Sequence, residues 1–246
     1  MTSNHLIVMD DAQALYVRAA EEIAHFAGEA ICTHGEFTLC LTGGTTPAST
    51  YELLATRFQL SVDWKEVQFF WGDERCVPPD DAASNFGMAN RMMLSRLALR
   101  PEQIHRIRGE DDPAQAAPEY ERELRRSMRL DDPGEYPSFN LLLLGLGDNA
   151  HIASLFPHHP ALHEQTRLAV AVEVEATPSK RISLTMPVIN NAERVLFLVS
   201  GENKAAAVKN VLQGSPDPEQ YPAQLVKPRN GETVWLIDKA AASRLV

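Results

Sequence analysis

The sequence predicts a protein of the α/β class, with a mainly parallel, doubly wound sheet that carries helices on both faces in a Rossmann-like three-layer architecture. Apolar, strand-like runs alternate along the chain with segments of helical periodicity, and several runs are apolar almost throughout, as in parallel strands buried on both faces. At 246 residues with 44% hydrophobic residues, the chain can bury a large core. We expect one domain over residues 1–246, because the sequence shows neither an internal repeat nor a Gly/Ser linker.

The first quarter of the chain is expected to form a helix and then a strand, loop and helix unit. From Asp11 to about His34, apolar residues recur at spacings of three and four, as an amphipathic helix requires. Pro47 fits the first position of the next helix, where its missing N–H costs nothing. The unit consists of a strand at 37–41, a turn at 42–47 and a helix at 48–58.

The same alternation continues to the C-terminal end. Helices are expected at 84–97, at 112–129 with an early interruption by Pro118, and at 203–212. The segment 131–138 is the best candidate for a domain boundary, although a surface loop explains it equally well. Further strands are expected at 67–71, 101–107, 139–144, 168–175, 181–185, 194–200 and 233–238, with a Pro-rich loop at 214–231.

Composition argues against several classes of partner. The formal net charge is −10 and no long basic run occurs, so the chain lacks the charge that a nucleic-acid binder needs. There is no run of eighteen apolar residues and no basic, apolar leader, so we expect a cytoplasmic protein without membrane contact. Cys32, Cys40 and Cys76 are widely spaced and odd in number, which indicates neither a disulfide framework nor a thiolate zinc cluster.

A glycine turn after the first predicted strand, LTGGTTP, has the chemistry of an anion site. Gly43 and Gly44 let backbone N–H groups approach an anion, and Thr45 and Thr46 add hydroxyl donors. The next helix points the positive end of its dipole at the same place. No Gly-Lys-Ser/Thr triplet follows, which argues against a nucleoside triphosphate loop. A plain tight turn explains these residues equally well at this point.

Charged side chains follow or open other predicted strands. Asp73, Glu74 and Arg75 form either a solvated turn or a carboxylate and guanidinium that face the crevice where α/β sheets bind ligands. Arg181 opens a strand and Lys204 starts a helix. Both are either ordinary surface charges or cations that converge on the anion of the glycine turn.

The stretch GLGDNAHIASLFP after strand 139–144 formally matches a dinucleotide-binding fingerprint through Gly145, Gly147 and Ala150. Such a loop must open a long helix, and Pro157 and Pro160 follow too closely for one. No acidic residue stands at the end of a following strand to bind the ribose. The turn is better explained as one that presents a histidine at a strand end.

His151 has the chemistry of a general base, because a neutral imidazole titrates near physiological pH. A core histidine that donates to a backbone carbonyl is the alternative. His158, His159 and His163 include one i, i+4 pair, but the flanking prolines and the lack of a neighbouring carboxylate argue against a metal site.

Taken together, LTGGTTP, FFWGDERCVP with SNFGMAN, LLLGLGDNAHIASLFP, KRISLTMPVIN and LVSGENKAAAV resemble, in order and spacing, the 6-phosphogluconolactonases of the pentose phosphate pathway. The resemblance covers nearly the whole chain from about residue 36. It implies hydrolysis of 6-phospho-D-glucono-1,5-lactone to 6-phospho-D-gluconate, with a phosphorylated sugar lactone as the small-molecule partner and without a metal or organic cofactor.

The resemblance also implies roles for individual residues. The family's general base falls on His151, and Asp73 and Arg75 fall beside the sugar ring. The family usually has Asp-Gly before this histidine, whereas this chain has Asn149-Ala150, and a backbone with φ > 0 would strain the alanine. The phosphate loop falls on Gly43, Gly44, Thr45 and Thr46, and the phosphate-binding cations on Arg181 and Lys204.

Two other functions compete with this one. Glucosamine-6-phosphate deaminases have a similar phosphate loop and histidine, but they carry Asp-Gly-His and a Glu five residues later, where this chain has Asn149 and Phe156. A sugar-phosphate sensor without catalytic activity would need an attached DNA-binding segment, and the ten residues before the first helix leave no room for one.

Overall fold

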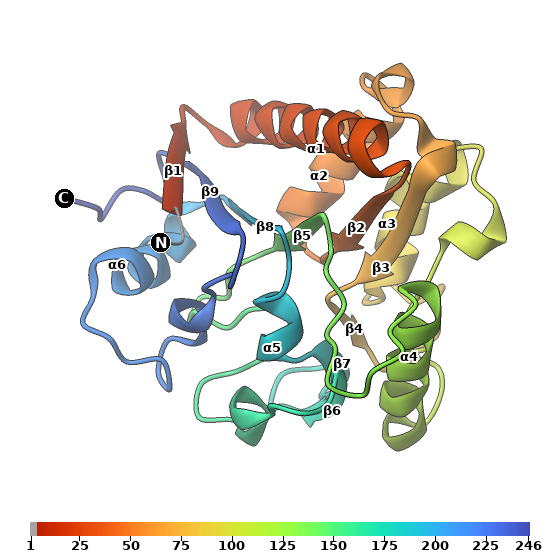
Figure 1. Ribbon diagram of the computed structural model, residues 1–246. Coiled ribbons are helices and arrows are strands. Elements are labelled where there is room, and N and C mark those ends of the chain that lie inside the picture. The colour runs from red at the N-terminus through yellow and green to blue at the C-terminus, as the bar shows by residue number, and fades with distance from the viewer. Residues whose placement is uncertain (1–3) are drawn as a thin grey trace.

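The computed structural model describes residues 4–246, and its centre is a six-stranded sheet in which all neighbouring strands run parallel (Figure 1). Strands β2 and β5 lie inside the sheet and every one of their residues is buried, as their apolar sequences require. The predicted α/β class is therefore confirmed. The order across the sheet is β1 (Asn4–Met9), β9 (Glu232–Asp238), β8 (Arg194–Val199), β5 (Leu141–Leu144), β2 (Phe37–Leu41) and β3 (Val67–Trp71).

Helices flank this sheet on both sides. Helix α1 (Ala12–His34) starts where predicted, because the Asp11 carboxylate accepts a hydrogen bond from the Ala14 N–H, and it ends at Gly35 with φ 82°. It packs on α2 (Thr45–Ala55) and on the sheet, while α5 (Met186–Ile189) and α6 (Ala205–Gln213) lie on the other side in Figure 1. No helix within residues 4–246 has the length and apolarity needed to cross a bilayer.

Three helical predictions need correction at their ends. Helix α2 begins at Thr45, so Pro47 is its third residue and not its first; its missing N–H still belongs to the four that have no partner within the helix. Helix α3 (Asn85–Met92) stops earlier than expected, because the chain tightens into a 3-10 turn at 94–96. The helix predicted at 203–212 begins as a 3-10 turn, Glu202–Lys204, before α6.

A second, antiparallel sheet of three strands stands beside the first and was not predicted. Its order is β4 (Asp73–Arg75), β7 (Lys180–Leu184) and β6 (Ala169–Glu173). The strands at 168–175 and 181–185 were expected within the main sheet, but a short connection joins them, and a short connection permits only antiparallel pairing. The Asp-Glu-Arg segment was expected as a turn, yet it forms a strand because it pairs with β7.

Two further differences concern single segments. The strand β1 was not predicted, since its short apolar run at the chain end carries little pattern, and it pairs only with β9. The segment 101–107 is not a strand: it forms a 3-10 turn at Pro101–Gln103 and one isolated bridge between Ile104 and Phe69.

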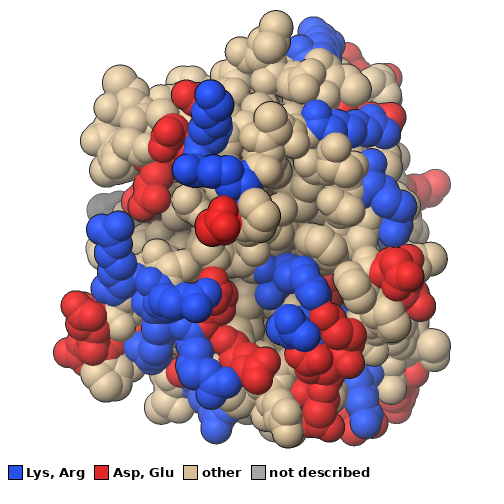
Figure 2. Space-filling view, turned by 90° about the vertical axis from the view of Figure 1, so that its right-hand side faces the viewer, with Lys and Arg blue, Asp and Glu red and all other residues tan. Residues whose placement is uncertain are grey.

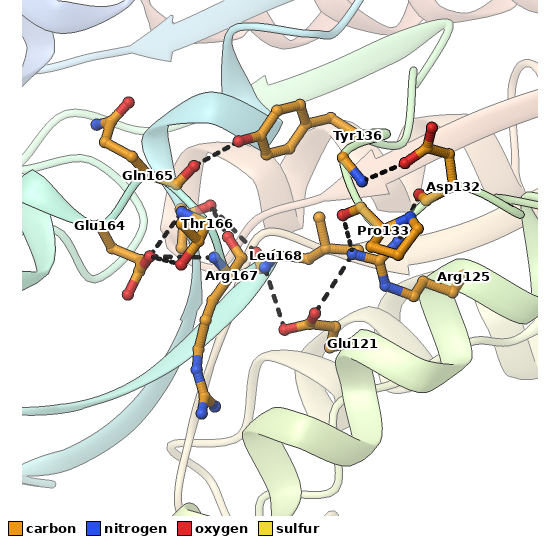
Figure 3. Close-up of polar contacts among 12 residues, drawn as sticks. Glu121, Arg125, Asp132, Pro133, Tyr136, Glu164, Gln165, Thr166, Arg167 and Leu168 are labelled. Atoms are coloured by element: carbon orange, nitrogen blue, oxygen red, sulfur yellow. Dashed lines mark hydrogen bonds and ion pairs between the residues drawn. The ribbon is translucent and has the colours of Figure 1, made fainter.

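The segment 131–138 is tied to the elements on both sides of it (Figure 3). Arg125 of α4 (Pro113–Ser127) donates to the carbonyls of Asp132 and Pro133, and the Tyr136 hydroxyl donates to the Gln165 carbonyl. The segment is thus a loop held by hydrogen bonds, as one of the two interpretations expected. On the face that carries α4, basic and acidic side chains alternate (Figure 2), including the helical pairs Arg122–Glu119, Arg125–Glu121 and Arg126–Glu123.

The order of the strands creates a crevice between β2 and β5. From β2 the chain adds β3 on one side, and from β5 it adds β8 and β9 on the other, so the direction of winding reverses between β2 and β5. The loops that leave the carboxyl ends of these two strands diverge, and ligands of open α/β sheets bind at such a point.

Candidate active site

A cavity of about 630 Å³ opens at this crevice and is lined by all nine residues for which the sequence predicts a role. They come from the loops after β2, β5 and β8 and from the paired strands β4 and β7. The structure thus brings together segments that lie far apart in the chain. The nine residues are Gly43, Gly44, Thr45, Thr46, Asp73, Arg75, His151, Arg181 and Lys204.

The turn after β2 presents the N-terminus of α2 to the cavity. Gly44 precedes the helix with φ 113°, a conformation that side chains rarely adopt. Among the described residues no side chain caps α2, so its first N–H groups remain available to an anion. The buried Tyr51 of the same helix fixes the turn: its hydroxyl accepts from the Thr42 N–H at 3.0 Å and donates to the Thr42 carbonyl at 2.9 Å.

Alternation along β4 separates the functions of its three residues. Asp73 and Arg75 face the cavity, while the buried Glu74 faces away and accepts hydrogen bonds at the start of α3. Its carboxylate accepts from the N–H groups of Asn85 and Phe86 at 2.7 and 2.8 Å, and from other donors nearby. Burial raises the pKa of Glu74, and these backbone donors oppose that effect. We therefore infer that Glu74 stabilises the fold.

Asp73 is held by two side chains that the sequence did not single out. Its carboxylate accepts from Ser154 Oγ at 2.7 Å and from Asn85 Nδ2 at 3.1 Å, and Asn85 Nδ2 also lies 2.9 Å from the Asp73 carbonyl. Asn85 contacts the glycine turn as well, because a Cβ added to Gly43 would lie 1.9 Å from its Oδ1. The strand β4 and the glycine turn after β2 therefore share one contact residue.

Arg75 and Arg181 stand opposite each other on β4 and β7. Arg181 is buried, its Nε donates to the Pro178 carbonyl at 3.3 Å, and Arg75 Nη1 donates to the Ala83 carbonyl at 2.9 Å. Within residues 4–246 neither guanidinium has a carboxylate partner, and the buried Arg75 Nε has no hydrogen-bond partner. Burial, followed by the charge of Arg75, lowers the pKa of Arg181. Such a pair of cations is suited to an added anion.

The turn after β5 carries His151 and contains no α-helix, as the two prolines predicted. The Gly147 N–H donates to the His151 carbonyl at 2.9 Å, and a Cβ on Gly147 would lie 2.0 Å from the imidazole Nδ1. A side chain at position 147 would therefore collide with the imidazole, so the position of His151 requires a glycine there. The imidazole stacks on Phe156 with ring centroids 4.0 Å apart.

The Asn149-Ala150 departure produces the strain that the sequence suggested, and it preserves a hydrogen bond to the histidine. Ala150 is buried with φ 63°, a left-handed conformation that favours glycine. Asn149 keeps a hydrogen bond, since its Oδ1 accepts from the His151 backbone N–H at 3.2 Å and lies 2.6 Å from Nδ1. Because this oxygen only accepts, Nδ1 carries the proton and Nε2 keeps the lone pair.

Electrostatics keep this imidazole neutral. Burial lowers the pKa of His151 to about 4, and the charges of Arg181, Lys204 and Arg75 act in the same direction, while Asp148 opposes them. At physiological pH the Nε2 lone pair is therefore free to accept a proton.

Among the three predicted cations, Lys204 alone has a carboxylate partner within residues 4–246. Its ammonium contacts Asp148 Oδ1, and Asn203 Nδ2 donates to the same oxygen at 3.1 Å. Asp148 and Asn203 were not predicted as site residues, because neither stands in a pattern that marks them before the loops meet.

Within residues 4–246, no three His, Cys, Asp or Glu side chains are grouped to hold a metal ion. The histidines of the predicted cluster have separate partners: His158 contacts Gln220, His159 Nδ1 accepts from the Ala161 N–H, and His163 pairs with Glu219.

Comparisons with known proteins find relatives along nearly the whole chain. Residues 10–235 match the family described as glucosamine-6-phosphate isomerases/6-phosphogluconolactonase. A 6-phosphogluconolactonase of Nostoc sp. is 40% identical over 239 residues, which are 97% of this chain and 97% of that protein.

Solved structures show the same fold. The 6-phosphogluconolactonase of Thermotoga maritima superposes with a TM-score of 0.83 at 27% identity, covering 96% of this chain and 100% of that one. A monomeric glucosamine-6-phosphate deaminase gives a TM-score of 0.80 at 25% identity, covering 97% and 99%.

Proposed function

The chain belongs to the family of glucosamine-6-phosphate isomerases and 6-phosphogluconolactonases and is a lactone-hydrolysing enzyme of it, and we propose that His151 is the general base with which it opens 6-phospho-D-glucono-1,5-lactone. The product is 6-phospho-D-gluconate, in the oxidative pentose phosphate pathway. One observation carries the proposal. A neutral imidazole with a free Nε2 shares a cavity with an uncapped helix N-terminus and with two arginines, the buried Arg181 and the half-buried Arg75, that have no carboxylate partner within residues 4–246.

In this proposal the substrate phosphate is bound at the α2 end of the cavity. The amides of the Gly43–Thr46 turn donate to it, and Arg181 and Lys204 supply positive charge. The phosphate takes no part in the chemistry, so its binding energy serves to orient the lactone. Asp73 and Arg75 line the same cavity, and in this proposal the sugar ring lies against them. The Asp73 carboxylate would accept hydrogen bonds from ring hydroxyls.

His151 then takes a proton from water through Nε2 as the water oxygen attacks the carbonyl carbon, C1. An oxyanion forms at C1, the tetrahedral intermediate collapses, and the bond from C1 to the ring oxygen breaks. The imidazolium returns the proton to the departing ring oxygen. The neighbouring cations Arg75, Arg181 and Lys204 favour this return, because they disfavour a charged imidazole.

The enzyme's hydrolysis of freshly prepared 6-phosphogluconolactone, measured through proton release and corrected for spontaneous opening, tests the proposal. We expect saturation kinetics with the phosphorylated lactone. Glucono-1,5-lactone without the phosphate should show a much lower kcat/KM, because it cannot use the phosphate contacts. Equal kcat/KM values for the two lactones would contradict the assignment of the phosphate site.

The deaminase is the second candidate, because a deaminase structure superposes on this chain nearly as well. The site favours it less. The residue five positions after His151 is Phe156, whose ring stacks on the imidazole where the deaminase pattern has a glutamate. Release of ammonia from glucosamine 6-phosphate, at a rate comparable to lactone hydrolysis, would reverse this preference.

A further inference from the structure

The three cations that line the cavity differ in what they contact before any ligand arrives. Arg75 and Arg181 have no carboxylate within 4.0 Å among the described residues, whereas Lys204 is paired with Asp148. Asn203 adds a second hydrogen bond to the same Asp148 oxygen. An internal carboxylate thus occupies one of the cations that the proposed function assigns to the phosphate.

The contact joins two loops across the cavity. Asp148 belongs to the turn after β5, three residues before His151, while Asn203 and Lys204 belong to the 3-10 turn after β8. Both loops line the cavity, so a bound anion and the Asp148 carboxylate would share the same space around the ammonium. Two anions cannot both contact this ammonium without repelling each other.

We propose that Asp148 competes with the substrate phosphate for Lys204 and thereby sets the affinity of the cavity for phosphorylated ligands. This inference rests on the proposed function, and it adds a residue that determines affinity and selectivity without taking part in the chemistry. The side chain of Asp148 is 66% exposed and that of Lys204 25%, so the pair is a surface ion pair of modest strength. A phosphate with nearly two negative charges displaces such a carboxylate, and a neutral sugar does not.

Competition of this kind acts equally on substrate and product, because both carry the same phosphate. It therefore raises KM and the inhibition constant of 6-phosphogluconate together, and it speeds release of the product. Glucono-1,5-lactone, which has no phosphate, gains nothing from displacing Asp148. Asp148 would thus lower the affinity of the cavity for phosphorylated ligands.

The test replaces Asp148 with asparagine and measures binding of inorganic phosphate by calorimetry at fixed ionic strength. We expect the Kd of phosphate to fall about 1.5- to fivefold in Asp148→Asn, the range in which one exposed ion pair acts. The KM of the phosphorylated lactone and the inhibition constant of 6-phosphogluconate should fall by the same factor, with no rise in kcat. The kcat/KM of glucono-1,5-lactone should not rise, because this lactone has no phosphate and the loss of the Asp148 charge only lowers the pKa of His151 further.

Asp111→Asn is the matched control, because Asp111 pairs with Arg108 outside the cavity and its replacement changes the net charge equally. An equal gain in phosphate affinity in this control would show a general effect of charge and would overturn the inference. Unchanged phosphate affinity in Asp148→Asn would overturn it as well.

A double-mutant cycle removes the remaining ambiguity. In a Lys204→Gln background, Asp148→Asn should leave phosphate affinity nearly unchanged, because the competition needs both partners. A gain as large as in the native background would show that Asp148 acts without Lys204, contrary to the proposal. If native enzyme fails to hydrolyse the lactone while Asp148→Asn binds phosphate more tightly, the proposed function falls and the competition at Lys204 stands. If native enzyme hydrolyses the lactone while Asp148→Asn does not bind phosphate more tightly, the competition is rejected and the proposed function stands.

Discussion

Under the proposed function, the imidazole of His151 faces two opposing requirements. It must be neutral to act as a base, and burial with three nearby cations ensures this by holding its pKa at about 4. A pKa so far below the operating pH makes a weak base, however. A bound phosphate would offset the charges of Arg181 and Lys204, so it would raise the basicity of His151 when the substrate is in place.

We therefore predict that the pKa of His151 rises when phosphate binds. An NMR titration of the imidazole, assigned with a His151→Gln variant, should give a midpoint near 4 in the free enzyme and a higher one with saturating inorganic phosphate. An unshifted midpoint would contradict the placement of the phosphate near this histidine.

The lowered pKa of His151 also predicts how the stability of the protein changes with pH. The unfolded chain binds the proton first, so native enzyme should lose stability relative to His151→Gln as the pH falls from about 6.5 towards 4.

Single residues also show which features of the site can be predicted from the sequence. The strain at Ala150 was foreseeable, because the turn pattern calls for a glycine there and the chain has a methyl group at φ 63°. The roles of Asn85 and Ser154 were not foreseeable in the same way. They act through Asp73, and a hydrogen bond between loops distant in sequence leaves no periodic signal.

At the scale of elements, the pairing of β4 with β7 places two arginines side by side in the cavity wall. This arrangement costs stability in the free enzyme, because like charges repel and one of them is buried. An anion bound between the two guanidinium groups, as in the proposed function, would offset this repulsion.

We predict opposite effects on function and stability when Arg181 is replaced by methionine, which has a similar length and no charge. The KM of the phosphorylated lactone should rise about 30-fold or more, as expected when a close charge partner is lost. The melting temperature should not fall, since the repulsion with Arg75 is relieved. A clear loss of stability together with an unchanged KM would refute this role. Arg108→Met, at an exposed site outside the cavity, serves as the control.

The loop before α2 offers a second test at this scale. In Gly43→Ala the new methyl group would meet Asn85 Oδ1 at 1.9 Å, so Asn85 must move away from Asp73. We expect a loss of about 1–3 kcal/mol in the free energy of unfolding, as for overpacked sites, and a higher KM. Gly28→Ala is the matched control, because no atom lies within 4 Å of its added Cβ, and the change should stabilise α1 by about 0.5–1 kcal/mol. Urea unfolding compares the two, and equal stability changes would contradict the Gly43 contact.

Local sequence patterns predicted individual helices and strands better than they predicted which strands pair. The helix from Asp11 and the buried strands β2 and β5 follow directly from spacing, capping and apolar runs. The strand β4 was missed, because three polar residues show no strand pattern and their extended form depends on β7, more than a hundred residues later. The antiparallel pairing of β6 and β7 was also missed, although the short connection between the two strands could have indicated it.

At the scale of the molecule, the reversal of winding between β2 and β5 brings the glycine turn after β2 and the His151 turn to one crevice. The order of motifs along the chain pointed to the family, which the match over residues 10–235 confirms. Composition and periodicity cannot give the order of strands in the sheet. The convergence of nine residues on one cavity is thus a property of the topology, and the sequence indicated it only through resemblance.

The most direct test of the account is the kcat of His151→Ala on freshly prepared 6-phosphogluconolactone, after subtraction of the spontaneous rate. A positioned general base contributes on the order of 10²- to 10⁴-fold, so the account predicts a loss of kcat in this range. Binding of 6-phosphogluconate should be retained, because the phosphate contacts do not involve the imidazole. A variant that keeps the native kcat would contradict the assignment of His151 as the general base.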